Sequence, residues 1–181
     1  MITGKCILSY PALFEAKANP SGAMKFGASL LFDKKDTKTI DEINAEIEKA
    51  KTKGKATIWA NKLPAFRYLP LRDGDAELAS GEKTDPIYKG KFFLNASSDT
   101  APGVVGPDAK PLLDQNRIYA GCIVRADINP FPYKNSGNCG IGWGFNNVML
   151  ISDGERLDGR VNAEDAFAGF VADEDNTEGL M

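Results

Sequence analysis

One stretch near the C-terminal end, residues 117–151, limits the possible folds more than any other part of the sequence. Small or apolar side chains alternate with polar ones over residues 119–131, as expected for a strand with one buried face. Asn-Ser-Gly at 135–137 predicts a turn, and Pro130 and Pro132 predict that ladder pairing ends before it. The stretch therefore predicts one long β-hairpin of the kind that closes a small β-barrel.

The return strand of this hairpin has two different faces. Gly140, Gly142 and Gly144 share one face, where bare backbone suits a tightly coiled barrel strand or the close approach of a ligand. The residues of the opposite face are apolar: Ile141, Trp143 and Phe145. They either fill the barrel or meet a second subunit, and the second possibility leads us to hypothesise a homodimer. Asn-Asn at 146–147 predicts a β-bulge.

The composition argues against catalysis. The chain of 181 residues contains no histidine, which removes the commonest general base and the commonest metal ligand. Its cysteines, Cys6, Cys122 and Cys139, form no CxxC pair and are expected to be reduced thiols of a cytoplasmic protein. No signal peptide and no apolar run long enough for a membrane span is present in the sequence. We therefore expect no enzymatic activity, no cofactor, no metal and no membrane partner.

Two strands and a helix are predicted upstream of the hairpin. Residues 2–10 alternate as a first strand, 19–22 form a turn, and the second strand has an inward face of Phe26, Ala28, Leu30 and Phe32. For the helix, Thr39 and Glu42 predict a capping box and Gly54 predicts the C-terminal end. The predicted buried face of the helix consists of Ile40, Ile43, Ile47 and Ala50.

Residues 55–72 are predicted to be irregular and interleave aromatic with basic side chains. The residues concerned are Trp59, Phe66 and Tyr68 among Lys55, Lys62, Arg67 and Arg72. In a single-strand binder, bases stack on exposed rings for roughly 1–3 kcal/mol each and cations follow the phosphates. The alternative is that Trp59 and Phe66 simply fix an inserted loop to the barrel.

A third strand is predicted over residues 88–97 and carries the strongest local signal for a binding site. Its inward side chains are Phe92, Leu94 and Ala96, and its other face holds Lys89, Lys91, Phe93 and Asn95. An aromatic ring between cations on an exposed strand face favours a nucleic-acid groove. We expect this groove to run over the third strand and the hairpin.

The segment LRDGDAEL at 71–78 contains three carboxylates, Asp73, Asp75 and Glu77. They suggest a metal site, but the segment lacks the glycine at the sixth position of a calcium loop. A Gly-centred turn with polar flanks is the favoured interpretation.

Charge is distributed unevenly along the chain. Residues 1–160 hold 19 acidic and 22 basic residues, a net charge of about +3, although the whole chain is at −3. No basic residue follows Arg160. The sequence thus predicts a mildly basic domain over residues 1–160 and a flexible, disordered acidic tail over residues 161–181.

An ordered set of motifs resembles a tailed-phage family of single-stranded DNA-binding proteins built on an OB-fold. The motifs, which span residues 2–155, are ITGKCILSY, KFGASLLFDKKD, PLRDGD, YKGKFFLNASS, APGVVGP, YAGCIVRADINPF and GWGFNNVMLISDGE. The resemblance implies sequence-tolerant binding of single-stranded DNA in phage replication and recombination, in the cytoplasm of the infected bacterial host. It also implies dimerisation, no enzymatic activity, and an acidic tail that contacts replication proteins and competes with DNA. Binding to RNA or duplex is expected to be weaker.

These observations predict a mainly β protein, a five-stranded OB-fold-like barrel with one inserted α-helix. The connecting residues 131–134 fall where an OB-fold places part of its oligonucleotide-binding surface. The predicted DNA-binding residues are Lys25, Trp59, Lys62, Arg67, Tyr68, Tyr88, Lys89, Lys91, Phe93, Arg125, Phe131, Tyr133 and Lys134. The predicted partner-binding residues of the tail are Glu164, Asp165, Phe167, Phe170, Asp173, Glu174, Asp175 and Glu178. Two alternatives are a magnesium-dependent phage nuclease using Asp73, Asp75 and Glu77, and a protein-interaction module using the same aromatic residues.

Overall fold

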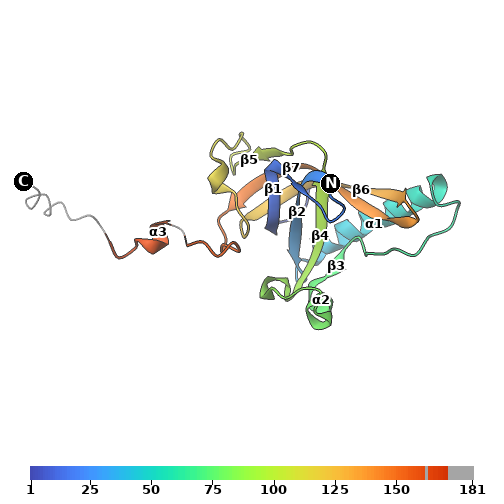
Figure 1. The fold of residues 1–181 in the computed structure, drawn as a ribbon, viewed down its shortest axis with the longest axis horizontal. Helices are drawn as coiled ribbons and strands as arrows, with labels where there is room; N and C mark the ends of the chain where they lie inside the picture. The colour runs from blue at the N-terminus through green and yellow to red at the C-terminus, as the bar shows by residue number, and fades with distance from the viewer. Residues whose placement is uncertain (162, 171–181) are drawn as a thin grey trace, which may run out of the picture.

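The computed structural model describes residues 1–161 and 163–170, and five of its strands close into a barrel (Figure 1). In chain order these strands are β1 (Cys6–Ala18), β2 (Met24–Asp33), β4 (Lys91–Ser98), β6 (Ile123–Asn135) and β7 (Asn138–Ser152). Around the barrel the order is β4-β2-β1-β6-β7, and a parallel pairing of β4 with β7 closes the ring. Counted as barrel strands one to five, the ring runs 1-2-3-5-4, which is the Greek-key order of an OB-fold. The predicted fold class is confirmed.

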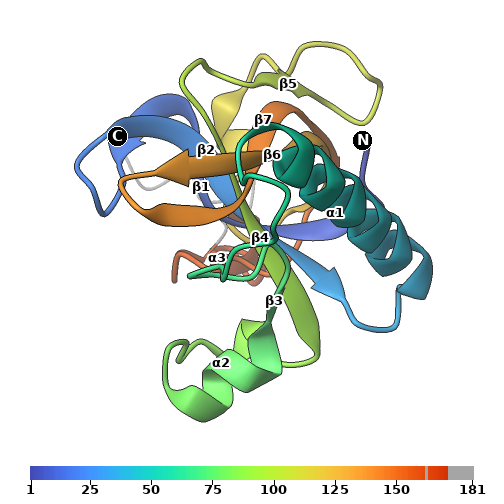
Figure 2. The ribbon, with the colours of Figure 1, turned by 90° about the vertical axis from the view of Figure 1, so that its right-hand side faces the viewer.

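Shorter elements decorate the barrel. Strand β3 (Arg72–Asp73) extends the sheet beside β4, and β5 (Gly103–Val105) runs parallel to β7. The helices are α1 (Thr37–Thr57), α2 (Gly74–Ser80) and α3 (Ala163–Ala166), with 3-10 turns η1 (Pro86–Tyr88) and η2 (Gln115–Arg117). Figure 2 shows α1 beside β6 and β7, and α2 projecting from the opposite side of the molecule next to β3. None of the helices in the described residues combines the length and the apolar character that crossing a bilayer requires.

The barrel interior is filled by the inward side chains of all five strands. Five of these side chains are 0 % exposed, namely Leu8, Leu30, Leu94, Val124 and Ile128. The predicted buried face of α1 packs on the same core. Ile141, Trp143 and Phe145 are also buried in this core. They therefore fill the barrel, and a second subunit is not needed to cover them. Cys6 and Cys122 are buried free thiols, and Cys139 is a half-buried one.

Helix α1 begins and ends at different residues from those predicted. Its N-cap is Asp36, whose carboxylate accepts a hydrogen bond of 3.2 Å from the Thr39 backbone N–H, so the capping box predicted at Thr39 and Glu42 is wrong. The helix also continues past Gly54. A Cβ on Gly54 would lie 2.4 Å from the Trp59 ring, so this glycine allows the close packing of an indole and does not end the helix.

The first strand is shifted and longer than predicted. It begins at Cys6, while Ile2 makes only an isolated bridge to Asp127, and it continues to Ala18 through a bulge. At this bulge Tyr10 has a φ of 45° and is exposed, although in the alternation over residues 2–10 it shares the phase of the buried Cys6 and Leu8. The predicted turn at residues 19–22 and the inward residues of β2 from Ala28 onward are confirmed, whereas Phe26 is only half-buried.

The β6–β7 hairpin extends further than the prolines suggested. Pairing continues through Pro130, opposite Trp143, and reaches Asn135 opposite Asn138, so residues 131–134 are strand and not a loop. The reason is visible at Ile128, whose N–H donates to the Met1 carbonyl and thus points away from β7. Pro130 and Pro132 share this phase, so they lack only N–H groups that β7 does not need.

The turn and the bulge of the hairpin agree with the prediction. Ser136 and Gly137 have φ values of 49° and 81°, as a two-residue type I′ turn requires. Asn146 is the additional residue on β7, since Asp127 pairs with Asn147 and Ile128 with Phe145.

Candidate nucleic-acid interface

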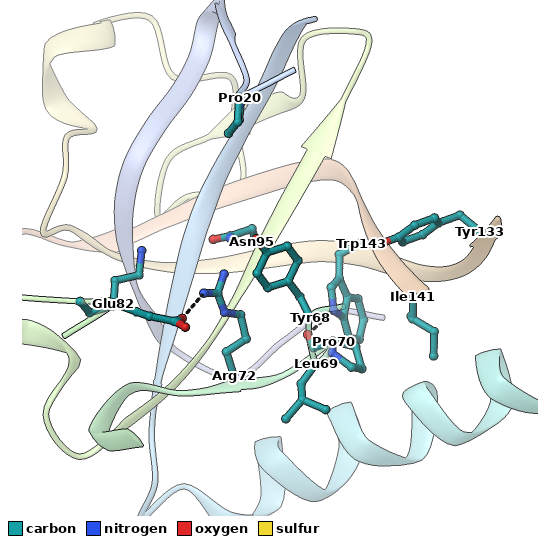
Figure 3. A pocket seen from close by; sticks show the side chains of 11 residues that line it. Pro20, Tyr68, Leu69, Pro70, Arg72, Glu82, Asn95, Tyr133, Ile141 and Trp143 are labelled. Carbon is teal, nitrogen blue, oxygen red and sulfur yellow. Dashed lines mark hydrogen bonds and ion pairs between the residues drawn. The ribbon is translucent and has the colours of Figure 1, made fainter. Parts of the chain in front are cut away.

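A groove of about 540 Å³ opens on the outer face of β4 (Figure 3). Four parts of the chain meet there: the β1–β2 loop, the segment before β3, the segment after α2, and the hairpin. The lining residues are Pro20, Tyr68, Leu69, Pro70, Arg72, Glu82, Lys83, Asn95, Tyr133, Ile141 and Trp143. Of the residues predicted to bind DNA, Tyr68 and Tyr133 line this groove.

Two indole rings attach residues 58–71, which we call the strap, to the hairpin. Trp143 donates from Nε1 to the Pro70 carbonyl at 2.8 Å, and Trp59 donates from Nε1 to the Tyr133 carbonyl at 3.2 Å. Trp59 is buried and its ring centroid lies 5.5 Å from that of Phe66. Trp59 thus has the structural role that the sequence left open, because it fixes the strap and offers no free face to a base.

Tyr68 is the most exposed of the aromatic residues that line the groove. Its side chain is 52 % exposed, and the guanidinium carbons of Arg67 and Arg72 lie 5.4 and 5.2 Å from its ring centroid. Arg72 is held in place by Glu77, which accepts hydrogen bonds of 2.5 Å from Nε and 2.9 Å from Nη2. Glu82 Oε2 lies 3.7 Å from Arg72 Nη2. A dashed line marks this ion pair in Figure 3. The ring is therefore positioned by cations, one of which is fixed by two carboxylates.

The prediction that Phe93 lies on an exposed face is wrong. Phe93 is 0 % exposed, because residues from α2 to η1 cover this half of β4. Its ring packs edge-on against Tyr88 at 4.9 Å, with the Arg72 guanidinium 4.9 Å from its centroid. Tyr88, another predicted DNA contact, is buried as well, and burial raises the pKa of its phenol to about 12. We call Leu31, Tyr88 and Phe93 the second core.

The three carboxylates at 73–77 do not converge on a metal site. Asp73 caps α2, and Lys34 donates to Asp73 at 2.6 Å and to Asp75 at 2.8 Å. The hydrogen bonds from Lys34 lower the pKa of both carboxyl groups. Glu77 is engaged by Arg72, and the described residues contain no group of three potential ligands that could hold a metal ion. The nuclease alternative therefore loses the residues on which it depended.

The glycines of β7 make room for rings of β6. A Cβ on Gly142 would lie 2.6 Å from the Phe131 ring, and one on Gly140 would lie 2.6 Å from the Tyr133 hydroxyl. The sequence suggested that this bare backbone serves either a tightly coiled strand or the close approach of a ligand. In the structure, side chains of the neighbouring strand β6 cover the backbone at Gly140 and Gly142. Phe131 remains 41 % exposed on the outer side of the hairpin.

The remaining predicted residues are dispersed. Lys62, Lys89 and Lys134 are exposed and Lys91 is half-buried, while Lys25 is ion-paired with Asp99. Arg125 donates to the Thr3 carbonyl at 3.1 Å and lines a different cavity with the start of α1, so the structure does not bring it to the groove. Arg72, Lys83, Asn95 and Trp143 also line the groove but are not among the predicted DNA-binding residues. Two of them had a usable signal, since Arg72 is one of the cations interleaved with aromatic residues in 55–72 and Asn95 shares the strand phase of Phe93.

Part of the predicted tail lies outside the described residues, namely Asp173, Glu174, Asp175 and Glu178. Before these, Ala163–Ala166 form the single helical turn α3, which contains Glu164 and Asp165. Phe167 and Phe170 are 65 % and 78 % exposed. Neither phenylalanine is therefore packed on the barrel wall.

Comparison with known proteins identifies relatives over nearly the whole chain. The family model described as "Enterobacter phage Enc34, ssDNA-binding protein" matches residues 1–180. A putative protein p50 of Acyrthosiphon pisum secondary endosymbiont phage 1 is 32% identical over 159 aligned residues, and the match covers 84% of this chain and 83% of that protein.

Solved structures share the fold. The single-stranded DNA-binding protein of bacteriophage Enc34 in complex with ssDNA has a TM-score of 0.73 and 25% identity, covering 86% of this chain and 88% of that one. The bacteriophage T7 protein gp2.5, another single-stranded DNA-binding protein, has a TM-score of 0.59 and 18% identity, covering 96% of this chain and 95% of that one. With the family match over residues 1–180, these findings show that the chain belongs to the Enc34 family of phage single-stranded DNA-binding proteins, which are not enzymes.

Proposed function

We propose that this protein binds single-stranded DNA, without sequence preference, in the groove on the outer face of β4. The observation that carries the proposal is the exposed Tyr68 ring, which lies in the groove beside the guanidinium groups of Arg67 and Arg72. A ring held among cations can stack on any base, since every base has a π face, while the cations attract the phosphates. The related Enc34 protein, solved in complex with ssDNA, supports the proposal.

Each part of the groove has a different task in this proposal. Tyr68 stacks on one base, and Tyr133 on the hairpin provides a second aromatic surface. Arg67 makes no ion pair among the described residues and is exposed, so it is available to a phosphate. Arg72 is already bound by Glu77 and mainly holds the Tyr68 ring. Duplex DNA and RNA helices bind more weakly, because their bases are paired and cannot reach the rings.

A titration of labelled oligo-dT against a duplex of equal length tests this function. We expect tighter binding of the single strand than of the duplex. For each unit increase in log[salt], log K should fall by about 0.7 per phosphate contact. Equal affinity for the duplex would contradict the proposed stacking. A complete lack of affinity at low salt would favour the protein-interaction module.

The acidic tail, residues 161–181, is proposed to compete with DNA and to recruit replication proteins. Glu164 and Asp165 carry charge of the same sign as phosphate, and a tethered segment has a high effective concentration at the groove. Removing residues 162–181 should therefore tighten oligo-dT binding at low salt, and the gain should shrink as salt screens the attraction. If the truncated protein binds oligo-dT with the same affinity as the full chain at low salt, the tail does not compete with DNA and its role is to increase solubility.

The biological setting belongs to the same proposal. We place the protein in the cytoplasm of the infected bacterial host, where it covers single strands during phage replication and recombination. The proposal of a homodimer rests on the family resemblance alone, because Ile141, Trp143 and Phe145 are buried inside the barrel and do not form a surface for a second subunit. Sedimentation equilibrium at micromolar concentration tests it, and a monomer mass would exclude the dimer.

A further inference from the structure

A second cavity lies across the sheet from the groove, at the bulge in β1. It has a volume of about 390 Å³, and its lining includes Ser9, Tyr10, Lys17, Tyr119 and Leu157. We call it the Tyr10 cavity. Among the residues predicted from sequence to bind DNA, none lines it.

The strand register connects this cavity with the groove. Asn95 of β4, which lines the groove, is paired with Ser29 of β2, and Ser29 is paired with Ser9 of β1, which lines the Tyr10 cavity. Because neighbouring strands are about 4.8 Å apart, Asn95 and Ser9 are separated by about 10 Å. At about 3.4 Å per stacked nucleotide, this span corresponds to roughly three nucleotides.

The sheet surface between the two cavities carries small side chains. The row Asn95–Ser29–Ser9 is polar, and the Ser29 hydroxyl donates to the Asn95 side-chain oxygen at 2.5 Å. The next row toward the β1–β2 loop consists of Ser97, Gly27 and Ala12. No residue of these two rows is larger than asparagine, but Ser9 and Ser29 are only 4 % and 8 % exposed, so a nucleic-acid strand that crosses β4, β2 and β1 has to pass above these serines.

The Tyr10 cavity has the aromatic character of a base-binding site. Tyr10 is 68 % exposed, and its left-handed backbone, with a φ of 45°, is uncommon for a bulky residue and presents the ring at the bulge. The second ring, Tyr119, is held by the Arg156 guanidinium carbon 4.1 Å from its centroid and donates its hydroxyl hydrogen to the Gly154 carbonyl at 3.1 Å.

The charges and the buried polar groups around this cavity also fit a nucleotide. Lys17 is exposed and donates to the Pro11 carbonyl at 3.2 Å, which keeps its ammonium group at the rim. The two carboxylates of the lining are engaged elsewhere, since Asp85 caps η1 and Asp158 pairs with Arg156. The buried Tyr88 hydroxyl has no hydrogen-bond partner among the described residues. The nearby Ser9 hydroxyl opposes the rise in the pKa of Tyr88 but does not meet hydrogen-bond geometry.

We propose that the Tyr10 cavity is a second base-binding subsite, and that one DNA strand passes from the groove over the Asn95–Ser29–Ser9 row into it. The inference rests on the proposed function, since it extends the path of the same ligand. It makes a prediction that the groove alone does not, namely that Tyr10 contributes to binding only when the oligonucleotide is long enough to reach both subsites.

The test is a titration of oligo-dT ligands from about 2 nucleotides, too short for the span of roughly three, to about 16 nucleotides, the upper site size of OB-folds. Tyr10→Gly removes the ring and suits the left-handed backbone, so the fold should be kept. We expect roughly 5- to 100-fold weaker binding of the longest ligand, the loss of about one stacked base, and wild-type binding of the shortest. Tyr10→Phe, which keeps the ring, should bind all lengths like wild type.

The outcomes separate the two proposals. If wild type binds oligo-dT but Tyr10→Gly matches it at every length, the second subsite is absent. A uniform loss at all lengths would overturn the ordered path as well. If wild type binds no oligo-dT, the proposed function itself fails. Should Tyr10→Gly not fold in a thermal melt, Tyr10→Asn replaces it, because asparagine also tolerates this backbone conformation.

Discussion

Two aromatic rings beside Arg72 differ in their exposure to solvent. The guanidinium carbon lies 4.9 Å from the Phe93 ring and 5.2 Å from the Tyr68 ring. Phe93 is completely buried beneath the residues from α2 to η1, whereas Tyr68 is 52 % exposed in the groove. A ring among cations is therefore compatible with both a core and a binding surface. What decides between them is whether another part of the chain covers that region of the sheet.

The largest expected effect concerns the covered half. Phe93→Ala should lower the free energy of unfolding by about 3–5 kcal/mol, because it opens a cavity in the second core between Tyr88 and Leu31. Chemical denaturation monitored by circular dichroism measures this. If the variant were as stable as wild type but bound oligo-dT weakly, Phe93 would be a base-stacking residue after all.

The open half should respond in the reverse way. Tyr68→Ala should weaken oligo-dT binding by about 1–3 kcal/mol and leave the stability of the fold nearly unchanged, since more than half of the side chain is in solvent. Tyr68→Phe is the matched control and should keep wild-type affinity. Anisotropy titrations of both variants, beside their melting curves, distinguish the two roles. Loss of stability without loss of affinity would place Tyr68 with Phe93 as a packing residue.

The comparison also explains how far the sequence could be interpreted. The barrel, its closing hairpin, the position of the turn and most of the inward residues follow from local alternation and turn chemistry. The covering of Phe93 depends on residues 74–88, which precede β4 and fold back over its outer face, and the alternation within β4 does not reveal it. Residue pattern alone likewise gave equal weight to Trp59 and Tyr68, although one indole fixes the strap and the other ring is open. The residues of the site could therefore be identified only from three-dimensional contacts, whereas the fold could be predicted without them.

A smaller effect should separate the cations of the groove from those elsewhere. Arg67→Ala should reduce the slope of log K against log[salt] by something under about 0.7, the single-strand value for one phosphate contact. Lys53, an exposed lysine near the end of α1 without an ion pair among the described residues, provides the control variant Lys53→Ala. Titrations over a series of salt concentrations give both slopes. Identical slopes for the two variants would mean that phosphates do not contact Arg67.

The smallest effect concerns the ion pair between Lys34 and Asp73, which joins α2 to the barrel. Hydrogen bonding from Lys34 lowers the pKa of Asp73, so the carboxylate stabilises the fold above its unfolded pKa of about 3.9, and this stabilisation is lost as the pH falls through the lower folded value. Asp73→Asn keeps a side chain able to cap α2 and should cost less than about 1 kcal/mol at neutral pH, because the pair is partly exposed. The difference in melting temperature from wild type should therefore narrow below about pH 4. A melting-temperature difference that stays constant for Asp73→Asn down to low pH would mean that the Asp73 charge does not hold α2 in place.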